Sequence, residues 1–219
     1  MFRLVGNIPE KFNVAVSGGV DSMVVLDFLL NGRHKPQAAL YFDHGTEHGQ
    51  VAKNFLRSRC EELGVNLIEG MIARERQPDE SKEEYWRNER YSFFAHYKNV
   101  ITAHHLDDAV EWWIFSSLHG QSKLIPYKRD NILRPFLRVP KSEIKNWADK
   151  KKVVYVEDPS NKETQYMRNH IRYNMVEQAL VVNPGLRKVI SRKLNEDYIN
   201  KYTNKLQNYS IDDSVLYCI

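Results

Sequence analysis

The sequence predicts an α/β protein with a doubly wound, mostly parallel sheet and a short helical C-terminal extension. Short runs of aliphatic and β-branched residues alternate with segments of helical periodicity, a pattern typical of a parallel sheet covered on both faces. The first of these runs passes through a glycine turn directly into a helix. Hydrophobic residues make up 42% of the 219 positions, which is enough for a buried core and argues against wholesale disorder.

The expected strands and helices follow one another along most of the chain. The strands are short apolar runs, as expected for strands buried on both faces of a sheet. The helices repeat apolar residues every three or four positions, and several end at asparagine, glycine or proline. The expected strands are residues 12–16, 38–42, 65–68, 99–103 and 153–156, and the expected helices are residues 23–30, 51–63, 83–97, 106–118, 140–148 and 166–180.

The sequence predicts a division of the chain near residue 185. Residues 1–185 contain the strand and helix alternation and are expected to form one catalytic domain. Residues 186–219 have weaker periodicity and many Lys, Asn, Asp and Tyr residues. We expect this C-terminal extension to form one or two short helices and a frayed tail.

Charge and cysteine content narrow the class of protein only slightly. Lys and Arg number 32 against 28 Asp and Glu, so the net charge of +4 permits a polyanionic partner without requiring one. Cys60 and Cys218 lie far apart in the sequence, which disfavours a disulfide scaffold or a structural zinc site. No apolar run reaches the length of a membrane span, so we expect a cytoplasmic protein without a membrane partner.

The glycine turn after the first strand has the composition of a phosphate-binding loop. Glycines let the backbone turn sharply and approach an anion, and the amides of the loop and of the helix start then point at its oxygens. Asp21 has the wrong charge for a phosphate contact, so it is expected to hold Mg²⁺ or to cap the helix. A plain glycine turn is the alternative for the short SGG sequence alone. The complete motif consists of Ser17, Gly18, Gly19, Val20, Asp21 and Ser22.

Three acidic residues open the helix expected after the fourth strand. Asp107 and Glu111 are four residues apart and Asp108 and Glu111 are three apart, so they share one face of the helix. Stacked like charges destabilise a helix unless a metal ion, a basic residue or a role in proton transfer offsets the repulsion. Two capping aspartates and a solvated glutamate are the alternative.

These motifs resemble those of the PP-loop ATP pyrophosphatases, and among them the tRNA(Ile)-lysidine synthetases. SGGVDS indicates the superfamily, whose fold is the adenine nucleotide alpha hydrolase-like sheet. The narrower resemblance covers about residues 12–185. It is carried by HLDD-x-x-E at residues 105–111, E-x-x-x-R-x-x-R-Y at 83–91, an RPL-like segment at 134–136, and DPSN followed by a YxRNxIR-like segment at 158–172.

The resemblance implies an ATP-dependent ligase that cleaves ATP to AMP and pyrophosphate. It implies ATP binding by the six residues of the SGGVDS loop together with Asp43 and His44, which follow the second strand. Asp107 is expected to assist the chemistry, and Asp108, Glu111 and Asp21 to support it. Mg²⁺ is expected to bind through Asp21 and Asp107.

The resemblance also implies the substrates. ATP would adenylate the 2-oxygen of the wobble cytidine in tRNA(Ile) with a CAU anticodon, and the ε-amine of free L-lysine would displace AMP. Arg168 and Arg172 share a helical face that could pair with RNA phosphates, although such faces more commonly pair with internal acids. The expected tRNA-binding residues are Arg87, Arg90, Arg134, Arg168, Asn169 and Arg172.

The sequence departs from the family at several points. Members generally carry further C-terminal domains that bind tRNA, so tRNA selection is expected to rest on the catalytic domain, its C-terminal segment or a homodimer partner. Trp112-Trp113 and residues 121–124 differ from the usual aliphatic helix and its following turn. Two alternatives remain. One is a tRNA 2-thiolase, which two isolated cysteines disfavour, and the other is a catalytically silent tRNA- or nucleotide-binding module.

Overall fold

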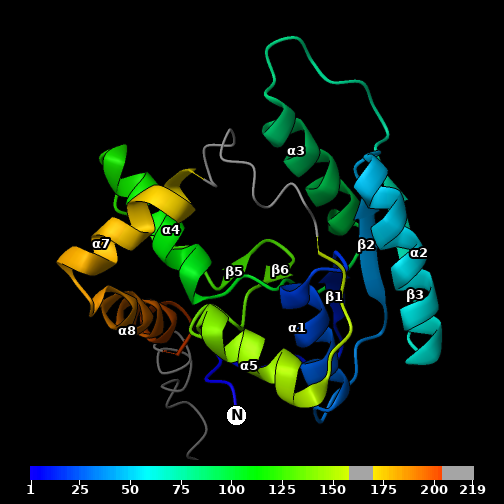
Figure 1. Cartoon of the computed structure of the whole chain (residues 1–219), viewed down its shortest axis with the longest axis horizontal. Coiled ribbons are helices and arrows are strands. Elements are labelled where there is room, and N and C mark those ends of the chain that lie inside the picture. The colour runs from blue at the N-terminus through cyan, green and yellow to red at the C-terminus, as the bar shows by residue number, and fades with distance from the viewer. Residues whose placement is uncertain (158–169, 204–219) are drawn as a thin grey trace, which may run out of the picture.

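The computed structural model describes residues 1–157 and 170–203. In this part of the chain a sheet of six strands runs in the order β3-β2-β1-β4-β6-β5 (Figure 1). All strand pairs are parallel except β5 with β6, which confirms the predicted mostly parallel α/β class. The strands are β1 (Asn13–Val16), β2 (Ala39–Asp43), β3 (Leu67–Met71), β4 (Val100–Ile101), β5 (Lys128–Arg129) and β6 (Ile132–Leu133).

The order of the strands reverses next to β1. From β1 the chain proceeds to β2 and β3 on one side, and then crosses to β4 on the other side. Val14 of β1 therefore pairs with Ala39 of β2 on one edge and with Ile101 of β4 on the other. The strand order thus reverses between β1 and β4, and doubly wound sheets bind ligands at the carboxyl ends of the strands where such a reversal occurs.

The helices cover both faces of the sheet and also form a group beside it. Figure 1 shows α4, α7 and α8 together on the side of the molecule away from α2 and α3. No helix in the described residues is long and apolar enough to cross a membrane. The helices are α1 (Val20–Leu30), α2 (Glu47–Glu62), α3 (Lys82–Ala95), α4 (Leu106–Leu118), α5 (Lys141–Lys151), α7 (Val176–Val182) and α8 (Leu186–Tyr198), with π-helical turns η2 (Ile171–Met175) and η3 (Ile199–Thr203).

Local capping explains where three of these helices begin. The side chain of Thr46 accepts a hydrogen bond from the Gly49 amide at the start of α2, and Ser81 caps α3 in the same way. At α4, His105 and Asp108 form a reciprocal capping box in which each side chain accepts from the other residue's amide. These caps satisfy amides that a helix start would otherwise leave without partners.

The core consists of packed apolar clusters on the two sides of the sheet and beneath α8. Phe2 and Phe28 pack edge-on against the fully buried Phe136, with ring centroids 5.9 and 5.6 Å apart. Trp147 of α5 packs against the same rings and donates a hydrogen bond from Nε1 to Asp27 Oδ2 at 2.7 Å. This contact joins α5 to α1 and so holds both helices beside the loop that follows β1.

The strand expected at residues 153–156 is not present. The Val156 amide instead donates to the carbonyl of Gly18 at 2.9 Å, so this apolar segment runs across the glycine loop rather than joining the sheet. The sheet is extended by the hairpin of β5 and β6, in which Lys128 pairs with Leu133. Sequence periodicity missed this hairpin because each strand has only two residues.

The C-terminal part of the chain is described only between residues 170 and 203. The helix expected at 166–180 is seen as η2 followed by α7, whereas residues 166–169 lie outside the described residues. The expected C-terminal helices are seen as α8 and η3. Ile190 of α8 is fully buried in a cluster with Leu106 and Val110 of α4, so α8 shares core with the domain before it.

We predict that α8 unfolds together with the rest of the domain. Ile190→Ala should lower the free energy of unfolding by about 2–5 kcal/mol, because it removes buried methylenes and leaves a cavity. Urea unfolding followed by circular dichroism would measure this. Lys193→Ala, at an exposed position of the same helix, is the control. A separate early transition in Ile190→Ala, with the main midpoint unchanged, would show that residues 186–203 are an independent appendage.

Candidate active site

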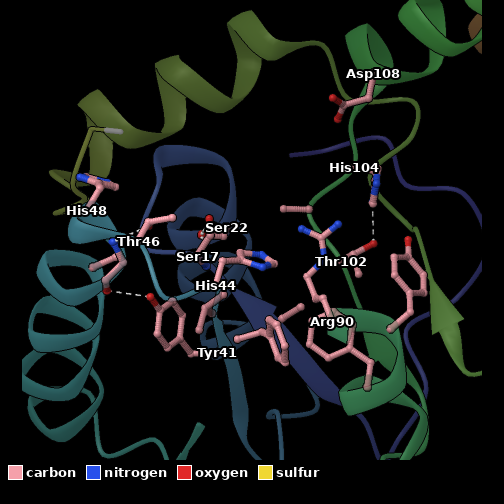
Figure 2. Close-up of a pocket in the computed structure, with 18 residues that line it drawn as sticks. Ser17, Ser22, Tyr41, His44, Thr46, His48, Arg90, Thr102, His104 and Asp108 are labelled. Carbon is pink, nitrogen blue, oxygen red and sulfur yellow. Dashed lines mark hydrogen bonds between the residues drawn. The ribbon is translucent and has the colours of Figure 1, made fainter. Parts of the chain in front are cut away.

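A cavity of about 290 Å³ opens at the carboxyl ends of β1, β2 and β4. Figure 2 shows Ser17, Ser22 and His44 close together in this cavity, with Arg90 and Thr102 facing them. The cavity therefore lies where the strand order reverses, and the glycine loop forms part of its wall. This is the place that the sequence predicted for a phosphate site.

The hydroxyl of Ser22 closes the loop that follows β1. The Ser17 amide donates to Ser22 Oγ at 3.0 Å, and the Ser22 hydroxyl donates to the Gly19 carbonyl at 2.9 Å. The two serine hydroxyl oxygens lie 3.2 Å apart, and both side chains line the cavity. The loop is thus held in shape by its own first and last residues. Because the Ser22 hydroxyl donates within the loop, Ser17 is the serine whose hydroxyl can donate to a ligand.

The two glycines of the loop serve different purposes. Gly18 has φ +83°, and a Cβ there would lie 2.9 Å from Val156 Cγ2, so both the backbone conformation and the crossing segment require glycine. A Cβ on Gly19 would meet only Ser17 Oγ at 3.6 Å. Gly19 also supplies no side-chain cap to α1. The open space beside Gly19 and the uncapped first amides of α1 fit an anionic group such as phosphate.

Asp21, in the first turn of α1, is engaged by two basic side chains. Lys141 Nζ donates to Asp21 Oδ1, and His105 Nε2 lies 3.7 Å from the same oxygen. Sequence reasoning missed Lys141, although it directly follows Pro140 at a predicted helix start. The ion pair ties the phosphate loop to the first residue of α5.

His44 and Asp43 follow β2 but face different surroundings. Asp43 Oδ1 accepts a hydrogen bond from the Gly45 amide at 2.8 Å and so orders the turn. The His44 ring lines the cavity between Phe42 and Trp86, at 5.1 and 5.3 Å between centroids. Burial, and secondly the charge of a nearby arginine, lower the pKa of His44 to about 4. Its buried Nδ1 has no hydrogen-bond partner within the described residues, so a neutral imidazole offers this atom to a ligand.

The two adjacent aspartates at the start of α4 point in different directions. Asp108 lines the cavity and accepts a hydrogen bond from the His105 amide at 2.8 Å. Asp107 accepts from the Lys141 amide at 2.8 Å and from Arg187 Nε at 2.8 Å. Asp108 is therefore the acid that lies with the phosphate loop, whereas Asp107 connects α4 to α5 and α8.

Arg172 offsets the repulsion expected between the acidic residues of α4. Its Nε donates to Glu111 Oε1 at 2.6 Å, and one terminal nitrogen lies 3.4 Å from Asp108 Oδ1. The structure thus shows a basic residue as the compensating partner, one of the three options that the sequence left open. It also shows the internal pairing that the sequence raised as the alternative to RNA contact for this residue.

The carboxylates do not form a ready-made metal site. Among the described residues, no three His, Cys, Asp or Glu side chains are grouped so that they could hold a metal ion. Asp21 and Asp107, the expected Mg²⁺ ligands, each contact Lys141, through its ammonium and its amide respectively. Mg²⁺ commonly binds one or two carboxylates together with substrate phosphates, so Asp21 beside the loop fits that use better than Asp107.

The expected tRNA-binding arginines occupy three kinds of position. Arg90 lines the cavity, and the exposed Arg87 lies over the Tyr91 ring at 5.6 Å from its centroid. Arg134 is only 3% exposed and donates to the Pro126 carbonyl at 3.1 Å. The contacts seen for Arg134 are thus internal, and its expected contact with RNA remains a prediction. Arg168 and Asn169 lie outside the described residues.

Several cavity residues were not identified from the sequence. Thr102 and His104 follow β4, and Thr102 Oγ1 lies 2.8 Å from His104 Nδ1. Tyr41 donates from its hydroxyl to the Gly49 carbonyl at 2.8 Å and forms the wall on the α2 side. Their position at the ends of predicted parallel strands was the available signal, since such ends converge on one edge of a sheet.

Comparison with known proteins places these features in a family. The sequence profile of the PP-loop domain matches residues 4–179. The chain is 33% identical to tRNA(Ile)-lysidine synthase from Nitrosomonas europaea over 201 residues, which cover 84% of this chain and 44% of that one. It is 31% identical to tRNA(Ile)-lysidine synthase from Lactiplantibacillus plantarum, over 88% of this chain and 46% of that one. The chain thus spans less than half the length of either relative.

A solved structure supports the fold assignment. The chain superposes on the U34-tRNA thiolase NcsA from Methanococcus maripaludis with a TM-score of 0.66, over 88% of this chain and 73% of that one. Sequence identity between the two is 17%. The likeness therefore establishes a shared arrangement of strands and helices.

We predict that His44 stays neutral well below neutral pH. An NMR titration of its ring should give a midpoint near 4, and Arg90→Met should raise this midpoint because it removes a nearby positive charge. An unfolded histidine binds its proton near pH 6.5, so the folding stability contributed by neutral His44 is complete above that pH and is lost as the pH falls toward 4. A midpoint near 6.5 in the folded protein would show that the ring is not buried as described.

Proposed function

Because the chain belongs to the PP-loop domain family, we propose that it acts as a tRNA(Ile)-lysidine synthase. Its substrates are then ATP, free L-lysine and tRNA(Ile) with a CAU anticodon, and its products are lysidine at the wobble position, AMP and pyrophosphate. One observation carries the proposal: Asp108 and the phosphate loop share a single cavity. The relatives supply the substrates, and this chain matches less than half of their length.

ATP would bind with its phosphates at the loop. The space beside Gly19 lets the triphosphate approach the amides that open α1, while the hydroxyl of Ser17 donates to a phosphate oxygen. The unused Nδ1 of His44 can accept a hydrogen bond from the nucleoside. With ATP in this position, its phosphates would take the place of the side-chain cap that α1 lacks. The contact between Ser17 and Ser22 would keep the loop in shape around them.

Mg²⁺ would accompany the nucleotide, and Asp21 is the residue placed to hold it. When bound, the ion neutralises charge on the phosphate oxygens. Asp21 is one-third exposed and is shared by Lys141 and His105, so its carboxylate can exchange these partners for a cation. Asp107, the second expected ligand, is engaged by Arg187 and by the Lys141 amide.

The chemistry requires a good leaving group and a proton acceptor. Transfer of AMP to the 2-oxygen of cytidine converts that oxygen into a leaving group, with release of pyrophosphate. The neutral ε-amine of lysine then forms the new bond to C2, the bond from C2 to oxygen breaks, and AMP departs. The amine must lose a proton during this step, and Asp108, the one carboxylate among the described residues that line the cavity, would accept it.

The geometry does not favour sulfur transfer. Cys60 lies on the buried face of α2, and burial raises the pKa of its thiol to about 11. A thiol with this pKa stays protonated and unreactive at neutral pH. The thiolase is only 17% identical to this chain, so the shared fold does not imply a shared substrate. We place the proposed activity in the cytoplasm, where free tRNA, lysine and ATP meet, and treat a homodimer as a further proposal.

The proposed function predicts incorporation of lysine into one tRNA. The protein incubated with ATP, Mg²⁺ and radiolabelled lysine should label an isoleucine tRNA transcript with a CAU anticodon, but not one with a GAU anticodon. AMP should accumulate in step with the label. Retained ATP binding without incorporation would instead support the silent nucleotide-binding module.

Because the two aspartates face different spaces, we predict that replacing each with asparagine affects the rate of lysine incorporation differently. Asp108→Asn should lower the rate of lysine incorporation by about 10²- to 10⁴-fold, because it removes a proton acceptor, and should leave ATP binding nearly unchanged. Asp107→Asn should cost less than about tenfold in rate, since it loses an ion pair with Arg187 outside the cavity. Melting temperatures of both variants control for folding. A larger loss in Asp107→Asn would restore the sequence-based assignment of Asp107 as the assisting acid.

A further inference from the structure

A second hollow, of about 320 Å³, lies between the first turns of α5 and α8. In Figure 1, α8 lies next to the end of α5 at which Lys141 stands. Asp107 lines this hollow, whereas the adjacent Asp108 lines the nucleotide cavity. Consecutive Cα atoms are about 3.8 Å apart, so the two spaces are near neighbours at the start of α4. The lining residues are Asp107, Pro140, Lys141, Ser142, Lys145 and Arg187.

The hollow has an excess of positive charge. Lys141, Lys145 and Arg187 line it together with one carboxylate, that of Asp107. Arg187 pairs with Asp107 at 2.6 Å and Lys141 pairs with Asp21, while the exposed Lys145 has no ion pair within residues 1–157 and 170–203. The Arg187 side chain is 41% exposed, so its guanidinium can also reach an incoming anion. An anion with several oxygens would be stabilised by all three cations.

Further cations lie along α8 outside the hollow. Lys188 follows Arg187 and is exposed, and the Arg192 side chain is 71% exposed one turn further on, with only a distant ion pair at 3.7 Å. A small isolated anion bound in the hollow would not reach these two cations. A polymer with regularly spaced phosphates would contact both the hollow and the helix beside it.

We propose that this hollow binds a backbone phosphate of the RNA substrate, with Lys145 and Arg187 as its main contacts. The inference rests on the proposed function, because that function supplies the RNA. A phosphate held here positions the strand beside the cavity that contains Asp108, and it competes with Asp107 for the Arg187 guanidinium. Such a contact positions the RNA backbone without reading its sequence.

Binding of the CAU tRNA transcript at several salt concentrations tests this site. Lys145→Gln should weaken binding about three- to tenfold and lower the slope of log affinity against log salt concentration by about one, as expected for one lost phosphate contact. Lys150→Gln makes the same charge change at an exposed position of the same helix, outside the hollow. It should leave the slope unchanged. Fluorescence anisotropy with the full chain measures both.

Two results would overturn the proposal. Equal slopes for Lys145→Gln and Lys150→Gln would show that the hollow makes no specific phosphate contact with RNA. Weaker inhibition by inorganic pyrophosphate in Lys145→Gln, with the tRNA slope unchanged, would assign the hollow to the product anion. Lysine incorporation by the wild-type protein, measured in parallel, reports on the proposed function. RNA binding that depends on Lys145 without incorporation would refute that function and retain the site.

Discussion

The reversal of strand order next to β1 is the constraint on which the rest of the structure depends. Parallel strands end on the same edge of a sheet, and here β1 leads into α1, which packs against α5, whereas β4 leads into α4, which packs against α8. The phosphate loop therefore meets the start of α4 across a cavity, although the two segments are separated by more than eighty positions in the sequence.

Charge pairing around this cavity explains how so many acids are tolerated at one edge of the sheet. Asp21 is held by Lys141, Asp107 by Arg187, and Asp108 and Glu111 by Arg172. Each basic partner comes from a segment that follows the acids in the chain, on α5, η2 or α8. These later elements thus stabilise the acidic edge by neutralising its charge. The acids are therefore held in place only when the whole domain is folded.

The sequence predicted the features that depend on local signals. The phosphate loop and the acidic helix start were found because each follows an apolar strand within a few residues. Nonlocal features were missed or misjudged. The pair of Lys141 with Asp21 spans 120 positions, and the apolar run ending at Val156 resembles a strand until its amide is seen to bond to Gly18. The buried role of Arg134 was equally hidden, because a motif shows which residue is present but not where it points.

The divergence of Asp107 and Asp108 has a simple geometric cause with a functional consequence. Successive residues of an α-helix are rotated by about 100° around its axis, so two adjacent acids must face different surroundings. The capping box between His105 and Asp108 fixes the first turn of α4 and hence both directions at once. The same turn lines both the cavity beside the phosphate loop and the basic hollow, so it connects the two spaces. Under the proposed function, this one helix start would help to place both the base to be activated and the backbone that carries it.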